Sequence, residues 1–158
     1  MTDVFCADCG TECRLVDGRD VDQRDPEIAD VRVWACPECP AAWAHHAPRT
    51  GAPAAAPAGL ETRNARELLA ERMIYPLIHE ATGGQENLQP LAIDRLTGFL
   101  ADRMSIEPEA CEVARFDLEQ CRAAWKALRG VTFDDVRQWA QRHRRTRKPE
   151  QPTEGVRA

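Results

Sequence analysis

The sequence predicts an α+β fold, with short antiparallel strands in the N-terminal third and an all-α bundle of three to four helices after them. The first part carries two C-x-x-C pairs. A stretch rich in proline, alanine and glycine follows at residues 48–60, and beyond it the apolar residues recur at helical spacing. We therefore predict a ribbon at 1–47, a linker at 48–60, a helical domain at 61–141 and a basic, flexible tail at 142–158.

Three short segments of the first part have the residue pattern of β-strands. They are Cys13–Asp17, Val31–Ala35 and Ala41–His45. Turn-forming and acidic residues at 17–27 separate the first two and indicate a solvated loop. A hairpin built from these strands is long enough to bring the two cysteine pairs together.

The second part divides into helices at prolines, glycines and capping residues. A capping box at Asn64–Glu67 predicts the start of the first helix, which Pro76 should kink and Gly83 should end. A second helix is expected to start near Asn87, with Pro90 in its first turn.

Two further helices are predicted from reciprocal caps at Asp117–Gln120 and Thr132–Asp135, with Gly130 between them. Apolar residues at helical spacing mark the faces that we expect to be buried. These residues are Leu68, Leu69, Met73, Leu77, Ile93, Leu96, Leu100, Met104, Leu118, Cys121, Trp125, Leu128, Val136, Trp139 and Ala140.

Composition and charge favour a cytoplasmic protein with an uneven charge distribution. No apolar run approaches the roughly 18 residues of a membrane span, and the first residues lack the basic and apolar regions of a secretory signal. The net charge of -5 argues against a protein that coats nucleic acid with its whole surface. Residues 1–50 carry 5 arginines against 10 acidic residues, whereas residues 101–158 carry 12 lysines and arginines against 10. A polyanion would therefore meet the C-terminal end first.

The cysteine pairs are the strongest chemical signal in the chain. In a reducing compartment, closely spaced cysteines are more often metal ligands than disulfides. Two intervening residues let both thiolates of a pair reach one ion at about 2.3 Å, and four thiolates fill a tetrahedral shell without leaving a position for water. We predict a small N-terminal four-cysteine zinc ribbon with one structural Zn²⁺, bound by Cys6, Cys9, Cys36 and Cys39.

The alternative chemistry for a C-x-x-C pair is a dithiol redox centre. Such a centre requires one pair at a helix N-terminus within a βαβ unit, and this sequence shows no such unit. Cys13 is expected to lie on a strand, and Cys111 and Cys121 are expected to be small core residues.

Two histidines, His45 and His46, follow the second cysteine pair. They could act as a general base, as a hydrogen-bond partner of a metal ligand or as a phosphate contact. The simpler interpretation is a pair on the last strand with one ring packed and one exposed. One alternative function is a small hydrolase or nuclease that uses His46 with helix carboxylates such as Glu71, Glu80 and Asp94. It requires an acid within hydrogen-bond reach of His46.

Basic residues gather at the end of the last predicted helix. The possible nucleic-acid contacts are Arg142, Arg144, Arg145, Arg147 and Lys148. Such clusters bind phosphates without reading sequence, and they are also common as solvated helix ends. A second alternative function is a repressor-like DNA-binding protein, with the third or fourth helix in a major groove. Arg122, Lys126 and Arg129 supply charge for it, but the base-reading residues Asn and Gln are sparse.

Further motifs accompany the cysteine pairs. They are Leu15-Val-Asp-Gly18, Trp34 shortly before the second pair, His46 after it, and Phe116-Asp-Leu-Glu-Gln-Cys121-Arg122. On these residues the chain resembles the "zinc-finger-containing" domain family of bacteriophages and prophages, which has no established biochemical function. The resemblance spans roughly residues 4–128.

The resemblance implies a phage-encoded accessory protein. The family's aromatic-rich Asp-Pro-Leu-Trp segment corresponds to Ile74-Tyr-Pro-Leu-Ile78, which keeps the proline and leucine and loses the acid and the tryptophan. The family pattern has a histidine five residues before that proline, and this chain has Glu71 at that position. These departures fall where a reactive site would lie, and they argue against catalysis.

We therefore expect a zinc-stabilised binding module of a bacteriophage accessory protein, working in the cytoplasm of a bacterial host cell. Its partner is a host protein or a nucleic acid and not a membrane. The ribbon is acidic and offers few aromatic residues for base stacking, which slightly favours a protein partner. We leave an enzymatic activity open and favour its absence.

Overall fold

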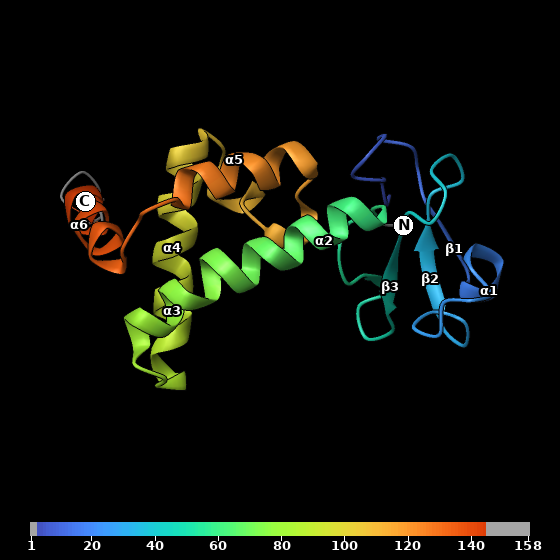
Figure 1. Ribbon diagram of the computed structural model, residues 1–158, viewed down its shortest axis with the longest axis horizontal. Coiled ribbons are helices and arrows are strands. Elements are labelled where there is room, and N and C mark those ends of the chain that lie inside the picture. Colours follow the sequence, from blue (N-terminus) through green and yellow to red (C-terminus); the bar gives the residue numbers. More distant parts are fainter. Residues whose placement is uncertain (1–2, 145–158) are drawn as a thin grey trace, which may run out of the picture.

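The computed structural model describes residues 3–144 and places a β unit beside a helical bundle, as the α+β prediction requires (Figure 1). The β unit is a four-stranded antiparallel sheet in the order β1-β2-β3-β4. Its strands are Arg14–Asp17 (β1), Arg32–Ala35 (β2), Trp43–Ala47 (β3) and Ala52–Pro53 (β4). Within the described residues, no helix is both long and apolar enough to cross a bilayer.

The sheet has a small core of its own on one face. Ile28, Val33 and Trp43 pack together and are almost fully buried. Ile28 comes from the connection between β1 and β2, which also contains the short helix α1 (Gly18–Val21). A Cβ atom on Gly18 would lie 1.7 Å from the Ile28 carbonyl oxygen, so only glycine fits there. Ile28 directly follows the acidic segment 17–27 that was expected to be a solvated loop, and within that segment Gly18 is the one buried residue.

Residues 48–60, the predicted linker, hydrogen-bond to both halves of the protein. Strand β4 pairs with β3, and Ala58 exchanges two backbone hydrogen bonds with Trp43. On the other side, the Ala56 N–H donates to the carbonyl of Ala114 at 2.9 Å. The low-complexity composition gave no indication of this role, because the pairing uses backbone groups that every residue has.

The first long helix is one rod made of three parts. Helix α2 (Leu60–Leu69) passes through a π-helical turn (Ala70–Ile74) into α3 (Tyr75–Thr82). Across the π turn, the Tyr75 N–H donates to the carbonyl of Ala70. Pro76 lies just after this turn, in the first turn of α3, where its missing N–H costs no hydrogen bond to a regular α-helix. The expected kink at Pro76 is therefore a local widening, as is common near functional and strained sites.

The remaining helices are α4 (Gln89–Met104), α5 (Leu118–Leu128) and α6 (Phe133–Arg144). Short 3-10 turns at 86–88, 108–110 and 113–115 connect them. The two predicted caps are confirmed. At α5, Asp117 and Gln120 form a reciprocal capping box, and at α6 the Asp135 carboxylate accepts hydrogen bonds from the N–H and hydroxyl of Thr132. Within the described residues the bundle thus consists of four helical rods, because α2 and α3 are continuous.

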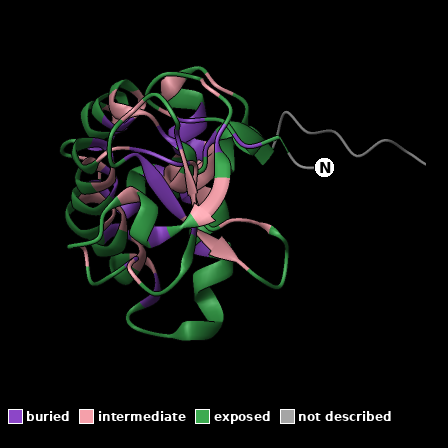
Figure 2. Cartoon of the chain, turned by 90° about the vertical axis from the view of Figure 1, so that its right-hand side faces the viewer, coloured by how far each residue is buried: buried purple, intermediate pink, exposed green. Residues whose placement is uncertain are grey.

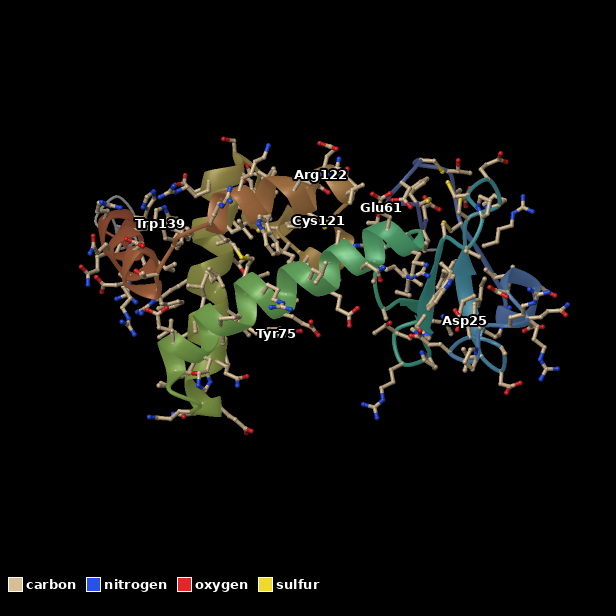
Figure 3. The ribbon with its side chains drawn as sticks, viewed as in Figure 1. Asp25, Glu61, Tyr75, Cys121, Arg122 and Trp139 are labelled. Carbon is tan, nitrogen blue, oxygen red and sulfur yellow. The ribbon has the colours of Figure 1, made fainter. Side chains whose placement is uncertain are left out.

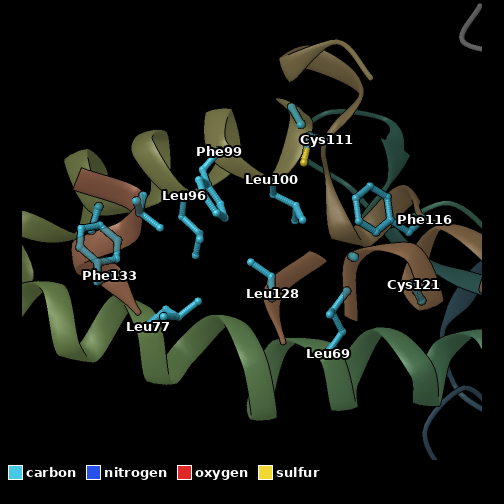
Figure 4. Packing of buried hydrophobic residues seen from close by; sticks show 14 residues of the cluster. Leu69, Leu77, Leu96, Phe99, Leu100, Cys111, Phe116, Cys121, Leu128 and Phe133 are labelled. Atoms are coloured by element: carbon cyan, nitrogen blue, oxygen red, sulfur yellow. The ribbon is translucent and has the colours of Figure 1, made fainter. Parts of the chain in front are cut away.

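The main core lies between these rods (Figure 4). Its buried members are Leu69, Leu77, Ala92, Leu96, Phe99, Leu100, Ala101, Cys111, Phe116, Cys121, Ala124, Leu128, Phe133 and Val136. Three residues that we expected to face inward are exposed instead: Leu68, Ile93 and Trp125 are 49%, 47% and 38% accessible. Each stands next to a residue that takes the inward position, namely Leu69, Ala92 and Ala124. Leu69, Leu96, Leu100 and Leu128, predicted from the same helical spacing, are buried, so the helical period was right and these three positions were wrong.

Viewed from the ribbon end, the buried residues lie toward the middle of the molecule and the exposed residues surround them (Figure 2). In the perpendicular view the molecule is elongated, with the ribbon at one end, α6 at the other and α2 running between them (Figure 1). The cysteine-bearing end and the basic end are therefore far apart.

Candidate metal centre

The two C-x-x-C pairs converge at one end of the ribbon. The Sγ atoms of Cys6, Cys9, Cys36 and Cys39 all lie within 4.8 Å of one another. The Sγ atoms of Cys9 and Cys36 are 3.5 Å apart. Four sulfurs at about 2.3 Å from a tetrahedral centre would be about 3.8 Å apart, so this spacing could hold one metal ion. Figure 3 shows sulfur atoms gathered beside the start of α2, near the labelled Glu61.

The first pair lies on a tight backbone turn. The Gly10 N–H donates to the carbonyl of Cys6 at 2.9 Å, and the Cys6 N–H donates to that of Thr11 at 2.9 Å. Gly10 has a φ of 74°, which is the left-handed conformation that glycine adopts without steric cost. The turn folds the chain back directly after Cys9, so that both thiols of the pair face the same point.

The second pair lies on a turn that is one residue longer. The Cys36 N–H donates to the carbonyl of Ala42 at 2.9 Å, and the Cys39 N–H points at the Cys36 Sγ at 3.4 Å. The left-handed position falls here on Ala41, with a φ of 53°. Because Pro40 is inserted, the left-handed residue comes two positions after Cys39, whereas in the first pair it comes directly after Cys9. The two pairs thus reach the same arrangement with different local sequences.

The cluster is half enclosed by apolar residues. Cys6 and Cys36 are buried, together with Val4, Cys13 and Ala42, whereas Cys9 is exposed. The Cys13 Sγ points at the carbonyl of Thr11, at 3.7 Å, and is not part of the four-sulfur group. All seven cysteines are free thiols.

The thiols have very different proton affinities. Hydrogen bonds from the Thr11 side chain and backbone lower the pKa of Cys9 to about 6. The hydrogen bond with Cys9, followed by burial, raises the pKa of Cys39 to about 12, and burial also raises that of Cys6. This split is expected where like charges would be crowded, because neighbouring thiols cannot all ionise without a cation. Burial raises the pKa of Cys13 to about 12, so this thiol keeps its proton at neutral pH.

The cysteine cluster is attached to the helical half through Asp8, inside the first pair. The Asp8 carboxylate accepts hydrogen bonds from the Gly59 N–H at 2.7 Å and from the Thr62 hydroxyl at 2.6 Å. Gly59 is the N-cap residue of α2 and provides no capping side chain. The cap predicted at Asn64 is therefore wrong: α2 begins at Leu60, and a side chain 51 residues away caps it.

Arg63, on the first turn of α2, contacts the turn that follows the second pair and the sheet. Its Nη1 donates to the carbonyl of Ala41 at 2.8 Å and to that of Ala58 at 2.6 Å. Its guanidinium lies 4.2 Å from the centre of the Trp43 ring. A cation over an indole contributes about 1 kcal/mol. Sequence reasoning missed both Asp8 and Arg63, because no local pattern marks contacts between such distant segments.

The two histidines on β3 have partners within the ribbon. The His46 Nδ1 accepts a hydrogen bond from the Trp34 Nε1 at 3.2 Å. The His45 Nε2 lies 3.2 Å from the Glu27 Oε1, and its ring packs edge-on against Trp43 at 5.0 Å. Both rings are half-buried. The His45 side chain is 43% exposed, and each ring also packs on a tryptophan on its own side of the strand.

The helix carboxylates considered for a hydrolytic site do not gather around His46. Glu80 accepts a hydrogen bond from the Phe133 N–H at 3.2 Å and so caps α6. Glu71 and Asp94 are exposed. In the described part of the chain, the four cysteines form the one group of metal-ligating side chains that is close enough to hold an ion.

Of the predicted nucleic-acid contacts, Arg142 and Arg144 lie exposed in the last turn of α6. Arg145, Arg147 and Lys148 lie outside the described residues. On α5, Arg122 pairs with Glu119, three residues earlier on the same helix. Lys126, also on α5, is exposed.

Comparison of the chain with protein-family models, with curated proteins and with solved structures gives no match. The site itself therefore defines the class of protein: an α+β protein with a four-cysteine centre that could hold one metal ion.

Proposed function

We propose that this protein is a zinc-stabilised binding module, in which one structural Zn²⁺ is held by Cys6, Cys9, Cys36 and Cys39. The observation that carries the proposal is the convergence of the four Sγ atoms within 4.8 Å. The ion fixes the ribbon, and the ribbon in turn fixes the start of α2 through Asp8.

Zinc fits this donor set best. Four thiolates are soft ligands, and tetrahedral all-sulfur sites select zinc or iron over calcium and magnesium. Zinc is the common metal of structural sites built from two C-x-x-C pairs. A dication also offsets the repulsion between neighbouring thiolates, which otherwise keeps the four thiols from ionising together.

A binding role suits the site better than a catalytic one. Four protein ligands complete a tetrahedral shell, so no position is left for a water molecule or a substrate. His46 has a tryptophan as its hydrogen-bond partner, and a general base needs an orienting acid. The ion therefore contributes folding free energy and not chemistry.

The partner, as part of the same proposal, is a host protein or a nucleic acid. The sequence resemblance to a phage family supports a bacteriophage accessory protein, and the free cysteines suit the reducing cytoplasm of a bacterial cell. The elongated shape offers two separate surfaces to such a partner, the acidic ribbon and the basic end at α6 (Figure 1).

The metal content of the purified chain tests this proposal. Native mass spectrometry and elemental analysis should give one zinc per chain, and Cys36→Ser should reduce the occupancy strongly. Cys13→Ser is the matched control, because Cys13 is buried in the same cluster but lies outside the four-sulfur group. Full zinc occupancy in Cys36→Ser, or loss of zinc in Cys13→Ser alone, would refute the assignment.

A further inference from the structure

Helix α6 is fixed to the bundle through one face only. Phe133 and Val136 are buried, and Trp139 is half-buried against α4. The Trp139 Nε1 donates to the Asp102 carboxylate at 2.9 Å, and its ring crosses α4 so closely that a Cβ on Gly98 would lie 2.8 Å from it. Figure 3 shows Trp139 between the two helices. The inner face of α6 is thus held firmly.

The opposite face of α6 presents hydrogen-bonding side chains in a row. Asp134, Gln138 and Gln141 recur at i, i+4 and i+7 and are exposed, so they lie on one line along the helix. The Gln138 Nε2 donates to the Asp134 carboxylate at 3.0 Å, which orients both groups outward. Carboxylates and carboxamides are among the groups that hydrogen-bond to base edges, carboxamides to adenine and carboxylates to cytosine.

Cationic side chains flank this row on both sides. Successive residues of a helix are rotated by about 100°, which places Arg142 on one side of the row and Arg137 and Arg144 on the other. All three are exposed. The Arg137 guanidinium lies over the Phe133 ring at 5.3 Å, which positions it beside the row. The outer face of α6 therefore has a hydrogen-bonding centre and cationic edges.

The connection between α5 and α6 has the length of the turn in a helix-turn-helix. Four residues, 129–132, separate the helices, and Gly130 has a φ of 73°. Helix α4 packs against both α5 and α6. In helix-turn-helix proteins the second helix of such a pair lies in the major groove.

The charge of this segment complements a polyanion. Within α6, residues 137–144 contain 3 arginines and no acidic residue, in a chain whose net charge is -5. Helix α6 stands at the end of the molecule away from the acidic ribbon (Figure 1). A phosphate backbone would thus meet the cations without approaching the acidic residues of the sheet.

We infer that the outer face of α6 binds duplex DNA, with Asp134, Gln138 and Gln141 toward the base edges and Arg137, Arg142 and Arg144 at the phosphates. This inference rests on the proposed binding function and names the partner class. An α-helix about 10–12 Å across fits the major groove of B-DNA, about 12 Å wide, whereas the major groove of duplex RNA is too narrow.

Fluorescence anisotropy with a labelled duplex tests the phosphate contacts in the full-length, zinc-loaded chain. The triple variant Arg137→Gln/Arg142→Gln/Arg144→Gln should weaken binding by about tenfold for each contact at about 50 mM salt, and should reduce the salt slope by about 0.9 per contact. The matched control is Arg14→Gln/Arg24→Gln/Arg72→Gln, which removes three exposed arginines elsewhere. It changes the net charge equally and should leave most of the affinity.

Selection from a random-sequence duplex pool tests the central row. The wild-type chain should enrich a short motif, and Gln138→Ala/Gln141→Ala should lose the enrichment while keeping the salt slope. Circular dichroism of each variant checks that the helices remain folded.

The inference is overturned if the chain does not bind duplex DNA, if the two triple variants weaken binding equally, or if single-stranded RNA binds more tightly than the duplex. It is also overturned if the pool yields no motif. Zinc content measured on the same samples separates the two proposals. If the chain holds one zinc but its DNA binding does not depend on α6, the DNA inference fails and the proposal of a zinc-stabilised module stands.

Discussion

The Asp8 carboxylate, between the two cysteines of the first pair, accepts a hydrogen bond from the buried hydroxyl of Thr62 at 2.6 Å. The same carboxylate accepts the Gly59 N–H. One side chain thus joins the candidate metal centre to the first turn of α2, so the folding of the ribbon bears directly on how the helical half begins.

Replacing Asp8 by alanine should destabilise this junction. It removes the cap of α2 and leaves the Thr62 hydroxyl without its acceptor, which together cost about 1–2 kcal/mol. The melting temperature of the zinc-loaded protein should fall. Glu38→Ala is the matched control, because Glu38 occupies the equivalent position in the second pair and is exposed. Equal effects of the two substitutions would show that the Asp8 contact contributes nothing specific.

Arg66 holds three segments together from the middle of α2. Its Nε donates to the carbonyl of Phe116 at 2.7 Å and its Nη1 to that of Ala56 at 2.8 Å. Arg66→Ala leaves both carbonyls without their donor and should cost about 2–3 kcal/mol. Chemical denaturation measures this loss. Arg72→Ala, at an exposed position of the same helical rod, should change the free energy of unfolding by less than about 0.5 kcal/mol.

Gly98 lets α6 approach α4. In Gly98→Ala, the new Cβ would meet the Trp139 ring at 2.8 Å, and overpacking of this kind costs about 1–3 kcal/mol. Trp139→Phe shortens the ring, so the double variant should recover part of the loss. A double-mutant cycle on the free energies of unfolding measures the coupling. Strictly additive effects would mean that α6 does not rest on Gly98.

The start of α6 depends on an ionised Asp135. Hydrogen bonds from the Thr132 N–H and hydroxyl lower the pKa of Asp135 below its ordinary value of 3.8. The stabilisation is therefore present above about pH 4 and is lost as the pH falls through the lowered pKa. In an NMR titration, the midpoint of the Asp135 carboxyl should lie below 3.8. A midpoint at or above 3.8 would contradict the cap.

Sequence periodicity and caps predicted most of the helical half. The caps at Asp117 and Thr132 were found because all their partners lie within three residues. The start of α2 was missed because Asp8, its cap, lies 51 residues away. Ile93 and Trp125 were placed inward by the helical spacing of apolar residues, but their small neighbours Ala92 and Ala124 are the residues buried there.

The cysteine centre could be predicted because the spacing within each pair is local and the ligand chemistry is specific. The surroundings of the centre could not. The contact of Arg63 with Trp43 and the pairing of Ala58 with Trp43 join segments with no shared sequence pattern. Strand β4 was missed for a related reason, since alanine and proline carry little strand preference of their own.

Amide hydrogen exchange, read with and without a strong zinc chelator, tests most directly the claim that zinc holds the ribbon together. We expect the ribbon, whose buried clusters are small, to bury too little apolar surface to fold without an ion, whereas the helices have a separate and larger core. Chelation should remove protection from residues 3–58 and from the first turn of α2, and should leave α4 and α5 protected. Unchanged protection of β1, β2 and β3 after complete removal of zinc would contradict the account.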